Sequence, residues 1–416
     1  MIPIPQQVQA LMNRGVRMHA PTSVTVDAGV DPSRIAQGVT IHAGCRLAGS
    51  QLAIGPGCEI GREAPATLHD CQLGEGVSLA GGYAAGAVFL DGVSVGSGAH
   101  VRPGTLMEEQ ASAAHTVGLK QTVLMPFVTL GSLINFCDCL MAGGTDRKNH
   151  SEVGSSYVHF NYTPHQDKAT ASLLGDVPRG VMLDQRPIFL GGQGGLVGPC
   201  RIEYGTIIAA GTVYRRDIGE PGQLVFGQFS RPVGQAAFEP GLYGSVRRQV
   251  AANLAYIGNL RALSAWYRQA RAPFLSRTPH GARCLEGAVS AIETMVAERL
   301  SRLGELAAKM PDSVARARAR SAEAAGEAIF VDQARFAERW PGAAKRIRTV
   351  AVDGVATADR DTVLAALARA GESGDYLAAV KALTPEARAA GTRWLQAIVD
   401  AVANAGQVFG SVGTAA

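Results

Sequence analysis

The sequence predicts a parallel β-helix over roughly residues 21–235 and an α-helical domain over residues 241–416. Two observations carry this prediction. Aliphatic residues recur every six positions in the first half, and most of the 50 glycines precede residue 240. A short amphipathic helix is expected within residues 1–20, ahead of the repeats. A chain of 416 residues is long enough for two such units, each with its own core.

The sixfold repeat excludes the simpler periodic structures. A period of six fits neither the 3.6 of a helix nor the 2 of an alternating strand. It fits a short strand followed by a tight corner, where each aliphatic side chain points into a prism and small residues turn the corner. Three sides of six residues make a coil of about 18 residues, stacked on the next by parallel pairing. The longest run in register is Leu190, Leu196, Ile202, Ile208 and Tyr214.

Two longer stretches interrupt the repeat, at residues 143–150 and 162–185. Loops that leave a regular scaffold are where such proteins usually carry function.

The second half of the chain shows helical spacing instead. Val246, Val250, Leu254, Ile257 and Leu260 recur three and four residues apart. The order Thr-Pro-Glu at residues 384–386 is a typical helix start. No chemical motif is visible there, so this half is interpreted as a packing or oligomerisation domain.

The composition of the chain argues against several classes of function. The net charge of +4 and the lack of basic runs among aromatics argue against a nucleic-acid partner. No apolar stretch approaches the length of a membrane span, so no membrane partner is expected. Seven scattered cysteines without a Cys-x-x-Cys pair, and no signal peptide, indicate a reduced, cytoplasmic protein. No metal site is predicted.

Polar residues are concentrated between residues 102 and 168. Four of the nine histidines fall in about fifty residues here, on a scaffold otherwise rich in glycine and aliphatics. This density is the strongest functional signal in the chain. The polar side chains include Arg102, His115, Lys120, Asp138, His150, His159, Asn161, Tyr162, His165 and Lys168.

Three stretches resemble one family. They are Arg-Pro-Gly at 102–104 with Lys120 eighteen residues on, Asn-Tyr at 161–162 followed by Lys168 and Leu-Gly-Asp at 174–176, and the coils at 194–199 and 207–213. Together they are similar to the C-terminal acetyltransferase domain of the bifunctional glucosamine-1-phosphate acetyltransferase and N-acetylglucosamine-1-phosphate uridylyltransferase. The resemblance covers roughly residues 90–232 and implies a left-handed parallel β-helix of the hexapeptide-repeat acyltransferase type.

The resemblance also implies roles for single residues. Arg102, Lys120 and Lys168 would hold phosphate through charge-assisted hydrogen bonds. Asn161 and Tyr162 would contact the sugar or the reacting amide. Gly192 and Ala210 would line the channel for acetyl-CoA or another acyl-CoA, the expected co-substrate. The sites of this family form between subunits, so a homotrimer is implied.

One departure from the family pattern concerns the general base. The stretch 133–138 reads Leu-Ile-Asn-Phe-Cys-Asp, with Phe136 where the family's base histidine is expected. A phenyl ring accepts no proton. Replacement candidates for the catalytic base are His159, His150 and Asp138.

Three functions remain open on the sequence alone. The first is acyl transfer to an amino-sugar phosphate or a sugar nucleotide, favoured by the polar loops. The second is a non-catalytic binding or scaffold protein that keeps the phosphate site and has lost its base, favoured by Phe136. The third is a purely structural trimeric spacer. Metal-assisted hydration with His115, His150 and His159 as ligands is a less favoured alternative.

Overall fold

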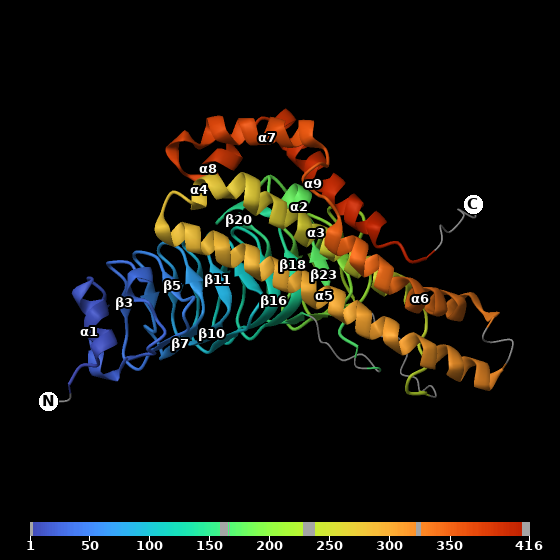
Figure 1. Ribbon diagram of the computed structural model, residues 1–416, viewed down its shortest axis with the longest axis horizontal. Coiled ribbons are helices and arrows are strands. Elements are labelled where there is room, and N and C mark those ends of the chain that lie inside the picture. The colour runs from blue at the N-terminus through green and yellow to red at the C-terminus, as the bar shows by residue number, and fades with distance from the viewer. Residues whose placement is uncertain (1–2, 159–164, 166, 228–237, 322–325, 410–416) are drawn as a thin grey trace.

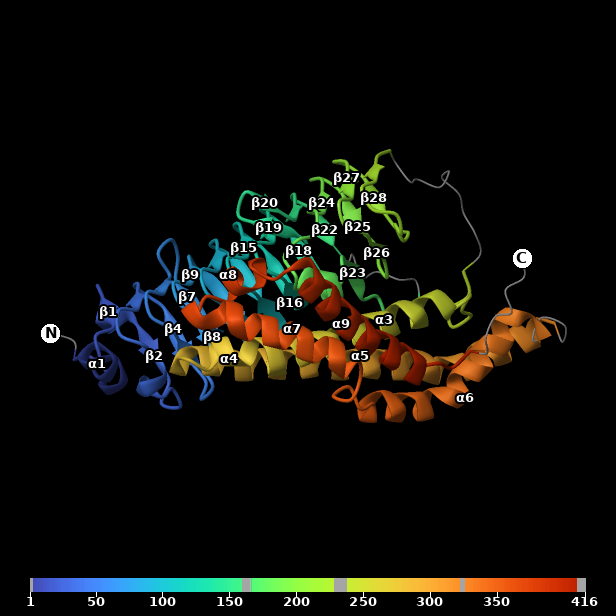
Figure 2. The same ribbon diagram turned by 90° about the horizontal axis from the view of Figure 1, so that it is seen from above.

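A computed structural model describes residues 3–158, 165, 167–227, 238–321 and 326–409. The first half is a parallel β-helix with three faces, and a layer of helices lies lengthwise along one of them (Figures 1 and 2). The predicted fold class, a left-handed parallel β-helix followed by an α-helical region, is confirmed. Helix α1 (Gln6–Asn13) covers the N-terminal end, and the first strand begins at Arg17.

The first face is a ladder of eleven two-residue strands that all run parallel. It consists of β1 (Arg17–Met18), β3 (Thr40–Ile41), β6 (Glu59–Ile60), β9 (Ser78–Leu79), β12 (Ser94–Val95), β15 (Ser112–Ala113), β17 (Thr129–Leu130), β21 (Glu152–Val153), β24 (Phe189–Leu190), β27 (Ile207–Ile208) and β29 (Leu224–Val225).

The second and third faces are joined by two long strands, β16 (Gly118–Leu124) and β18 (Asn135–Met141), which bend round the corner between them. The second face also contains β2 (Thr25–Val26), β4 (Arg46–Ala48), β7 (Ala66–His69), β10 (Gly82–Ala85), β13 (Ala99–Val101), β22 (Tyr157–Val158), β25 (Gly195–Leu196) and β28 (Val213–Tyr214). The third face also contains β5 (Ala53–Ile54), β8 (Gln72–Leu73), β11 (Ala87–Phe89), β14 (Thr105–Met107), β23 (Ser172–Leu174) and β26 (Arg201–Ile202).

The period of six arises, as the sequence predicts, from one side chain on each face of the coil that points into the prism. Along each strand one residue points into the prism and its neighbours point out. On the second face Leu119, Phe136, Val158 and Leu196 follow one another in register, and all four are buried. Parallel pairing repeats every coil, so the core is a continuous stack of aliphatic and aromatic side chains.

The predicted excursion at 143–150 is a hairpin of β19 (Gly144–Asp146) and β20 (Asn149–His150). It leaves the prism between the third and first faces. Within the second excursion, the short helix α2 (Val177–Gly180) is capped by the Asp176 carboxylate, which accepts from the Arg179 backbone N–H.

The helical region begins with α3 (Arg247–Trp266), which continues through a π-helical turn (Tyr267–Arg271) into α4 (Ala272–Leu275). Next come α5 (Pro279–Arg320), α6 (Ala328–Thr349), α7 (Thr357–Ala370), α8 (Tyr376–Lys381) and α9 (Pro385–Ala405). The predicted start of α9 is confirmed, because the Thr384 hydroxyl accepts from the Ala387 N–H and Pro385 is the first helical residue.

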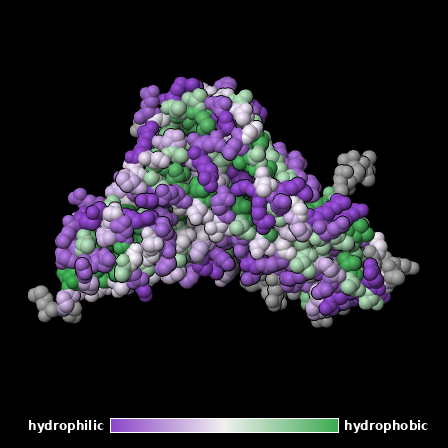
Figure 3. All heavy atoms as spheres, viewed as in Figure 1, coloured by the Kyte–Doolittle hydropathy of each residue, from purple (hydrophilic) through white to green (hydrophobic). Residues whose placement is uncertain are grey.

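Helix α5 packs along the third face against β5, β8, β11 and β14, and α3 packs against β23 (Figure 2). The β-helix and the helices therefore share one continuous core. The approach is close at Gly287 of α5, where an added β-carbon would lie 2.2 Å from the Gln72 Oε1. Hydrophilic side chains dominate the face seen in Figure 3, with smaller hydrophobic patches between them. Among the described residues, no helix is both long enough and apolar enough to cross a membrane.

Candidate functional site

Two cations predicted to bind phosphate lie next to each other on the second face, at its corner with the third. The register of β13, β16 and β18 places Arg102, Lys120 and Cys137 in consecutive coils of one column. Adjacent strands are about 4.8 Å apart, so the two basic side chains can reach the same anion. The structure thus brings together two residues that are eighteen positions apart in the sequence.

Both cations have few partners. The Arg102 Nη2 donates to the Cys137 Sγ at 3.5 Å, and the Arg102 Nε is buried without a hydrogen bond. In the described part of the chain, no hydrogen bond or ion pair engages the Lys120 ammonium. Burial raises the pKa of the Cys137 thiol despite the nearby Arg102 charge, so this thiol is neutral at pH 7 and balances neither cation.

Lys168 joins this corner through its backbone. The Arg299 Nη1 on α5 donates to the Lys168 carbonyl at 3.3 Å, and the Arg299 Nη2 donates to the Asp138 Oδ1 at 2.7 Å. Asp138 follows Cys137 directly, so Arg299 connects the three-residue column to the segment that carries Lys168. The Lys168 side chain is exposed.

The surroundings of the Asp138 carboxylate fit a structural role. Its carboxylate is 6% exposed, and its partner Arg299 is 1% exposed. A buried carboxylate and a buried guanidinium in direct contact compensate each other's charge, so neither can be removed without leaving the other unpaired in the interior. This geometry favours a role in docking α5 over the predicted role as catalytic base.

His150 lies at the other edge of the third face, on the hairpin β19–β20. Its Nε2 is 3.8 Å from the Glu152 carboxylate, and its Nδ1 is buried without a hydrogen bond. The structure does not bring it together with Arg102 and Lys120 within one chain. The remaining catalytic candidate, His159, and the substrate candidates Asn161 and Tyr162 lie outside the described residues.

Phe136 does not occupy a surface position. Its side chain is fully buried in the prism, between Leu119 and Val158 of the neighbouring coils. A base that touches substrate must point outwards, and the outward residues of this strand are Asn135 and Cys137. Phe136 therefore lies at a core position, from which no side chain could act as a base on a bound substrate.

The two residues predicted for the acyl-CoA channel stack in adjacent coils. Leu190 pairs with Ile208, which puts Gly192 beside Ala210, and the Gly211 N–H donates to the Gly192 carbonyl at 2.8 Å. Gly192 is half-buried and Ala210 is exposed, at the corner between the first and second faces. This corner lies across the second face from Arg102, and several coils further along.

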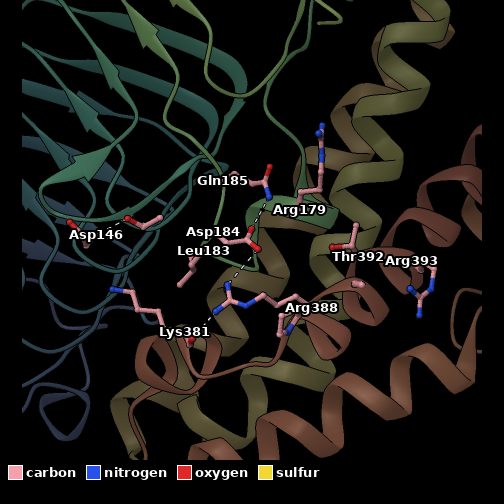
Figure 4. Close-up of a pocket in the computed structure, with 12 residues that line it drawn as sticks. Asp146, Arg179, Leu183, Asp184, Gln185, Lys381, Arg388, Thr392 and Arg393 are labelled. Atoms are coloured by element: carbon pink, nitrogen blue, oxygen red, sulfur yellow. Dashed lines mark hydrogen bonds and ion pairs between the residues drawn. The ribbon is translucent and has the colours of Figure 1, made fainter. Parts of the chain in front are cut away.

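A cavity of about 890 Å³ lies elsewhere, between the hairpin, the segment after α2 and the start of α9 (Figure 4). Its arginines are already engaged. Arg388 donates to the carbonyls of Leu383, Met182 and Lys381 and faces Asp184 at 3.6 Å. Arg179 pairs with Asp176 and Glu203, and Arg393 pairs with Asp359. The cavity therefore offers little uncompensated charge.

No group of three or more metal-ligating side chains occurs among the described residues. Of the three histidines considered for metal-assisted hydration, His115 bonds the Ser132 hydroxyl at 2.9 Å, and His150 lies on the hairpin.

Sequence reasoning missed Arg299 altogether, because an arginine on a long amphipathic helix carries no local signal of its partner across the fold.

Comparisons with known proteins agree with the motifs. No family model matches the chain. The bifunctional protein GlmU of Geotalea uraniireducens is 28% identical over 211 residues, 50% of this chain and 41% of that protein. The bifunctional protein GlmU of Nocardia farcinica is 30% identical over 213 residues, 51% of this chain and 38% of that protein. The resemblance to this bifunctional family is thereby confirmed for about half of the chain.

The chain spans only about two-fifths of the length of these relatives. Among solved structures, an Arabidopsis UDP-N-acetylglucosamine acyltransferase aligns with 50% of this chain and 70% of that chain. Its sequence identity is 15% and its TM-score 0.23, a similarity too low to bear on function.

Proposed function

We propose that the chain transfers an acyl group from acyl-CoA, acetyl-CoA in the first instance, to a phosphorylated amino sugar or a sugar nucleotide. The observation that carries this proposal is the column of Arg102 and Lys120, two cations with few partners on a β-helix similar to GlmU. A phosphate bound there would receive charge-assisted hydrogen bonds from both. Lys168, anchored beside them through Arg299, would supply a third.

In this proposal the amine of the sugar, or a hydroxyl where the nitrogen is already acylated, attacks the acyl thioester carbonyl. The new C–N or C–O bond forms as the C–S bond breaks, a base takes the proton of the attacking group, and coenzyme A leaves as the thiolate. His159 and His150 are the candidates for that base. Asp138 is disfavoured by its ion pair with Arg299.

We also propose that the protein works as a homotrimer. Outward apolar side chains flank the corner that carries Gly192 and Ala210. Phe189, Ile207 and Leu224 form one column on the first face and are 39–61% exposed. Such a column on an open β-face is suited to burial against another copy of the chain. Light scattering should give three times the mass of the chain, and Ile207→Asp should shift the protein towards the monomer.

The first experiment is a thermal-shift titration with glucosamine-1-phosphate, UDP-N-acetylglucosamine and acetyl-CoA, followed by a turnover assay on the pair that binds. A ligand that binds only the native state raises the melting temperature. Lys120→Ala and Lys168→Ala should each weaken binding of the phosphorylated sugar by about 1–3 kcal/mol. Unchanged affinity in both variants contradicts the phosphate site. Sugar binding without any turnover would instead favour a non-catalytic sugar-nucleotide-binding or scaffold protein.

The two histidines are tested separately. His159→Ala should abolish turnover while the sugar still binds, if His159 is the base. A fully active His159→Ala variant excludes it and leaves His150→Ala as the next variant to assay.

A further inference from the structure

An exposed aromatic pair lies on the second face directly beside the two cations. Tyr83 of β10 and His100 of β13 are register neighbours in adjacent coils. Their rings stack, with centroids 5.0 Å apart and planes 22° apart. Tyr83 is 39% exposed and His100 is also exposed. Stacked rings on an open strand face form a platform on which a further planar ring can rest.

Among the residues that the structure describes, no side chain fills the next position of this stack. The next residue in the column is Gly118, followed by Asn135. A β-carbon added at Gly118 would have only the Asn135 Oδ1 at 3.4 Å and the Ile134 carbonyl oxygen at 3.9 Å near it. The backbone does not require glycine here, because Gly118 is not among the residues with positive φ.

The size of the gap fits one planar ring. His100 and Asn135 are two coils apart, which is about 9–10 Å at the usual strand spacing. A ring placed midway would lie at roughly the 4.5–7 Å from the His100 centroid at which aromatic rings stack. The Asn135 amide at the other wall can hydrogen-bond to the edge of such a ring.

The cations lie within reach of that place. Arg102 is two residues beyond His100 and Lys120 is two residues beyond Gly118, so all four are on the outward side of the same strands. Two residues along a strand span roughly 7 Å. A flat ring over Gly118 therefore has the side chains of Arg102 and Lys120 at roughly the distance that separates a nucleobase from its phosphates, with the Glu298 carboxylate of α5 also near Lys120.

We propose that this part of the second face binds a nucleoside diphosphate moiety, with the base stacked on His100 in the gap at Gly118 and the diphosphate on Arg102 and Lys120. The inference rests on the proposed function and deepens it. A nucleotide sugar as acceptor contains this moiety. The adenosine diphosphate part of acyl-CoA contains it as well, but acyl-CoA bound here would replace the channel proposed at Gly192 and Ala210 and would exclude a sugar phosphate from Arg102 and Lys120.

The test uses the full chain with UDP, ADP and inorganic pyrophosphate as calorimetric probes. One nucleoside diphosphate should bind roughly ten- to a hundredfold tighter than pyrophosphate, the contribution of one stacked base. Tighter UDP points to a nucleotide sugar, and tighter ADP points to acyl-CoA. Gly118→Ile should reduce that affinity to the pyrophosphate level. A β-branched residue favours the strand, and the melting temperature shows that the variant is folded.

Thr67→Ile is the matched control, because Thr67 adjoins Tyr83 at the other end of the same stack. It should leave all three affinities unchanged. His100→Phe should keep the nucleoside preference, since phenyl also stacks, whereas His100→Ala should lose most of it.

Equal affinities for all three probes, or a Gly118→Ile variant that still prefers the nucleoside diphosphate, overturn the inference. The proposed function survives that result if glucosamine-1-phosphate still binds and loses affinity in Lys120→Ala. Failure of every phosphate probe refutes both.

Discussion

A buried cluster of two carboxylates and one guanidinium should make the stability of this protein fall as the pH rises towards neutrality. Glu108 and Glu109, at the end of β14, both face Arg271 from the helical layer. All three side chains are at most 9% exposed. The Tyr267 hydroxyl donates to the Glu108 Oε1 at 2.6 Å, and the Arg271 guanidinium lies over the Tyr376 ring at 4.1 Å.

One guanidinium cannot balance two buried carboxylates. Burial raises the pKa of Glu108 to about 7, with Glu109 adding to the increase and Arg271 opposing it. Between the ordinary value of 4.5 and this value, the native protein keeps a proton that the unfolded chain has released. The free energy of unfolding therefore decreases as the pH rises through this window, and the loss is complete above about pH 7. The separation of the two pKa values corresponds to about 3 kcal/mol.

Glu108→Gln isolates this contribution, because glutamine has the shape of the protonated acid and cannot ionise. Its carbonyl oxygen still accepts from the Tyr267 hydroxyl. Urea unfolding followed by far-UV circular dichroism at pH 5 and pH 8 gives the two free energies for each protein. The difference between variant and wild type should be about 1 kcal/mol at pH 5 and about 3 kcal/mol at pH 8, in favour of the variant at both.

Glu109→Gln serves as the control. It removes the carboxylate that pairs with the fully buried Arg271 while Glu108 is protonated, so it should destabilise the protein at pH 5 by about 3–5 kcal/mol. At pH 8 the ionised Glu108 can take over as the partner of Arg271, so the loss should be smaller. The reasoning is refuted if the wild type and Glu108→Gln differ by the same amount at pH 5 and pH 8.

Three further predictions concern packing, and each is measured as a change in the free energy of unfolding. Phe136→Ala should cost about 3–5 kcal/mol, because it empties a fully buried place in the prism; a loss below 1 kcal/mol would mean that the ring is not in the core. Arg299→Met should lower the free energy of unfolding by about 3–5 kcal/mol, because it removes the buried cation that pairs with Asp138. The double variant Arg299→Met/Asp138→Asn should recover part of that loss, and no recovery would contradict the ion pair. Gly287→Ala should destabilise the protein because Gln72 and Val88 occupy the space of the new methyl group. Gly304→Ala on the same helix, whose methyl group would make only ordinary contact with the Trp340 ring, should gain up to about 1 kcal/mol. Equal effects of the two substitutions would argue against close docking of α5.

The sequence alone determined the β-helix, because its period is local. An inward aliphatic residue every six positions has only one regular arrangement that buries all of them, and Leu190 to Tyr214 display it without the rest of the fold. The spacing of eighteen between Arg102 and Lys120 equals one coil, so their neighbourhood also followed from the sequence. The helical second half followed from its own spacing in the same way.

Only the tertiary structure decided which face the helices cover and which polar residues they engage. Arg299 meets Asp138 across 161 positions, and Arg271 meets Glu109 across 162, and no periodicity links residues so far apart. The same limit explains why the sequence alone matched Phe136, a core residue, to the position of the family's base histidine. Successive strand residues point to opposite sides, so an alignment shifted by one residue exchanges a core position for a surface position. A local pattern sets the scaffold, whereas the packing of one element on another is fixed by complementarity of shape and charge between segments that the sequence keeps apart.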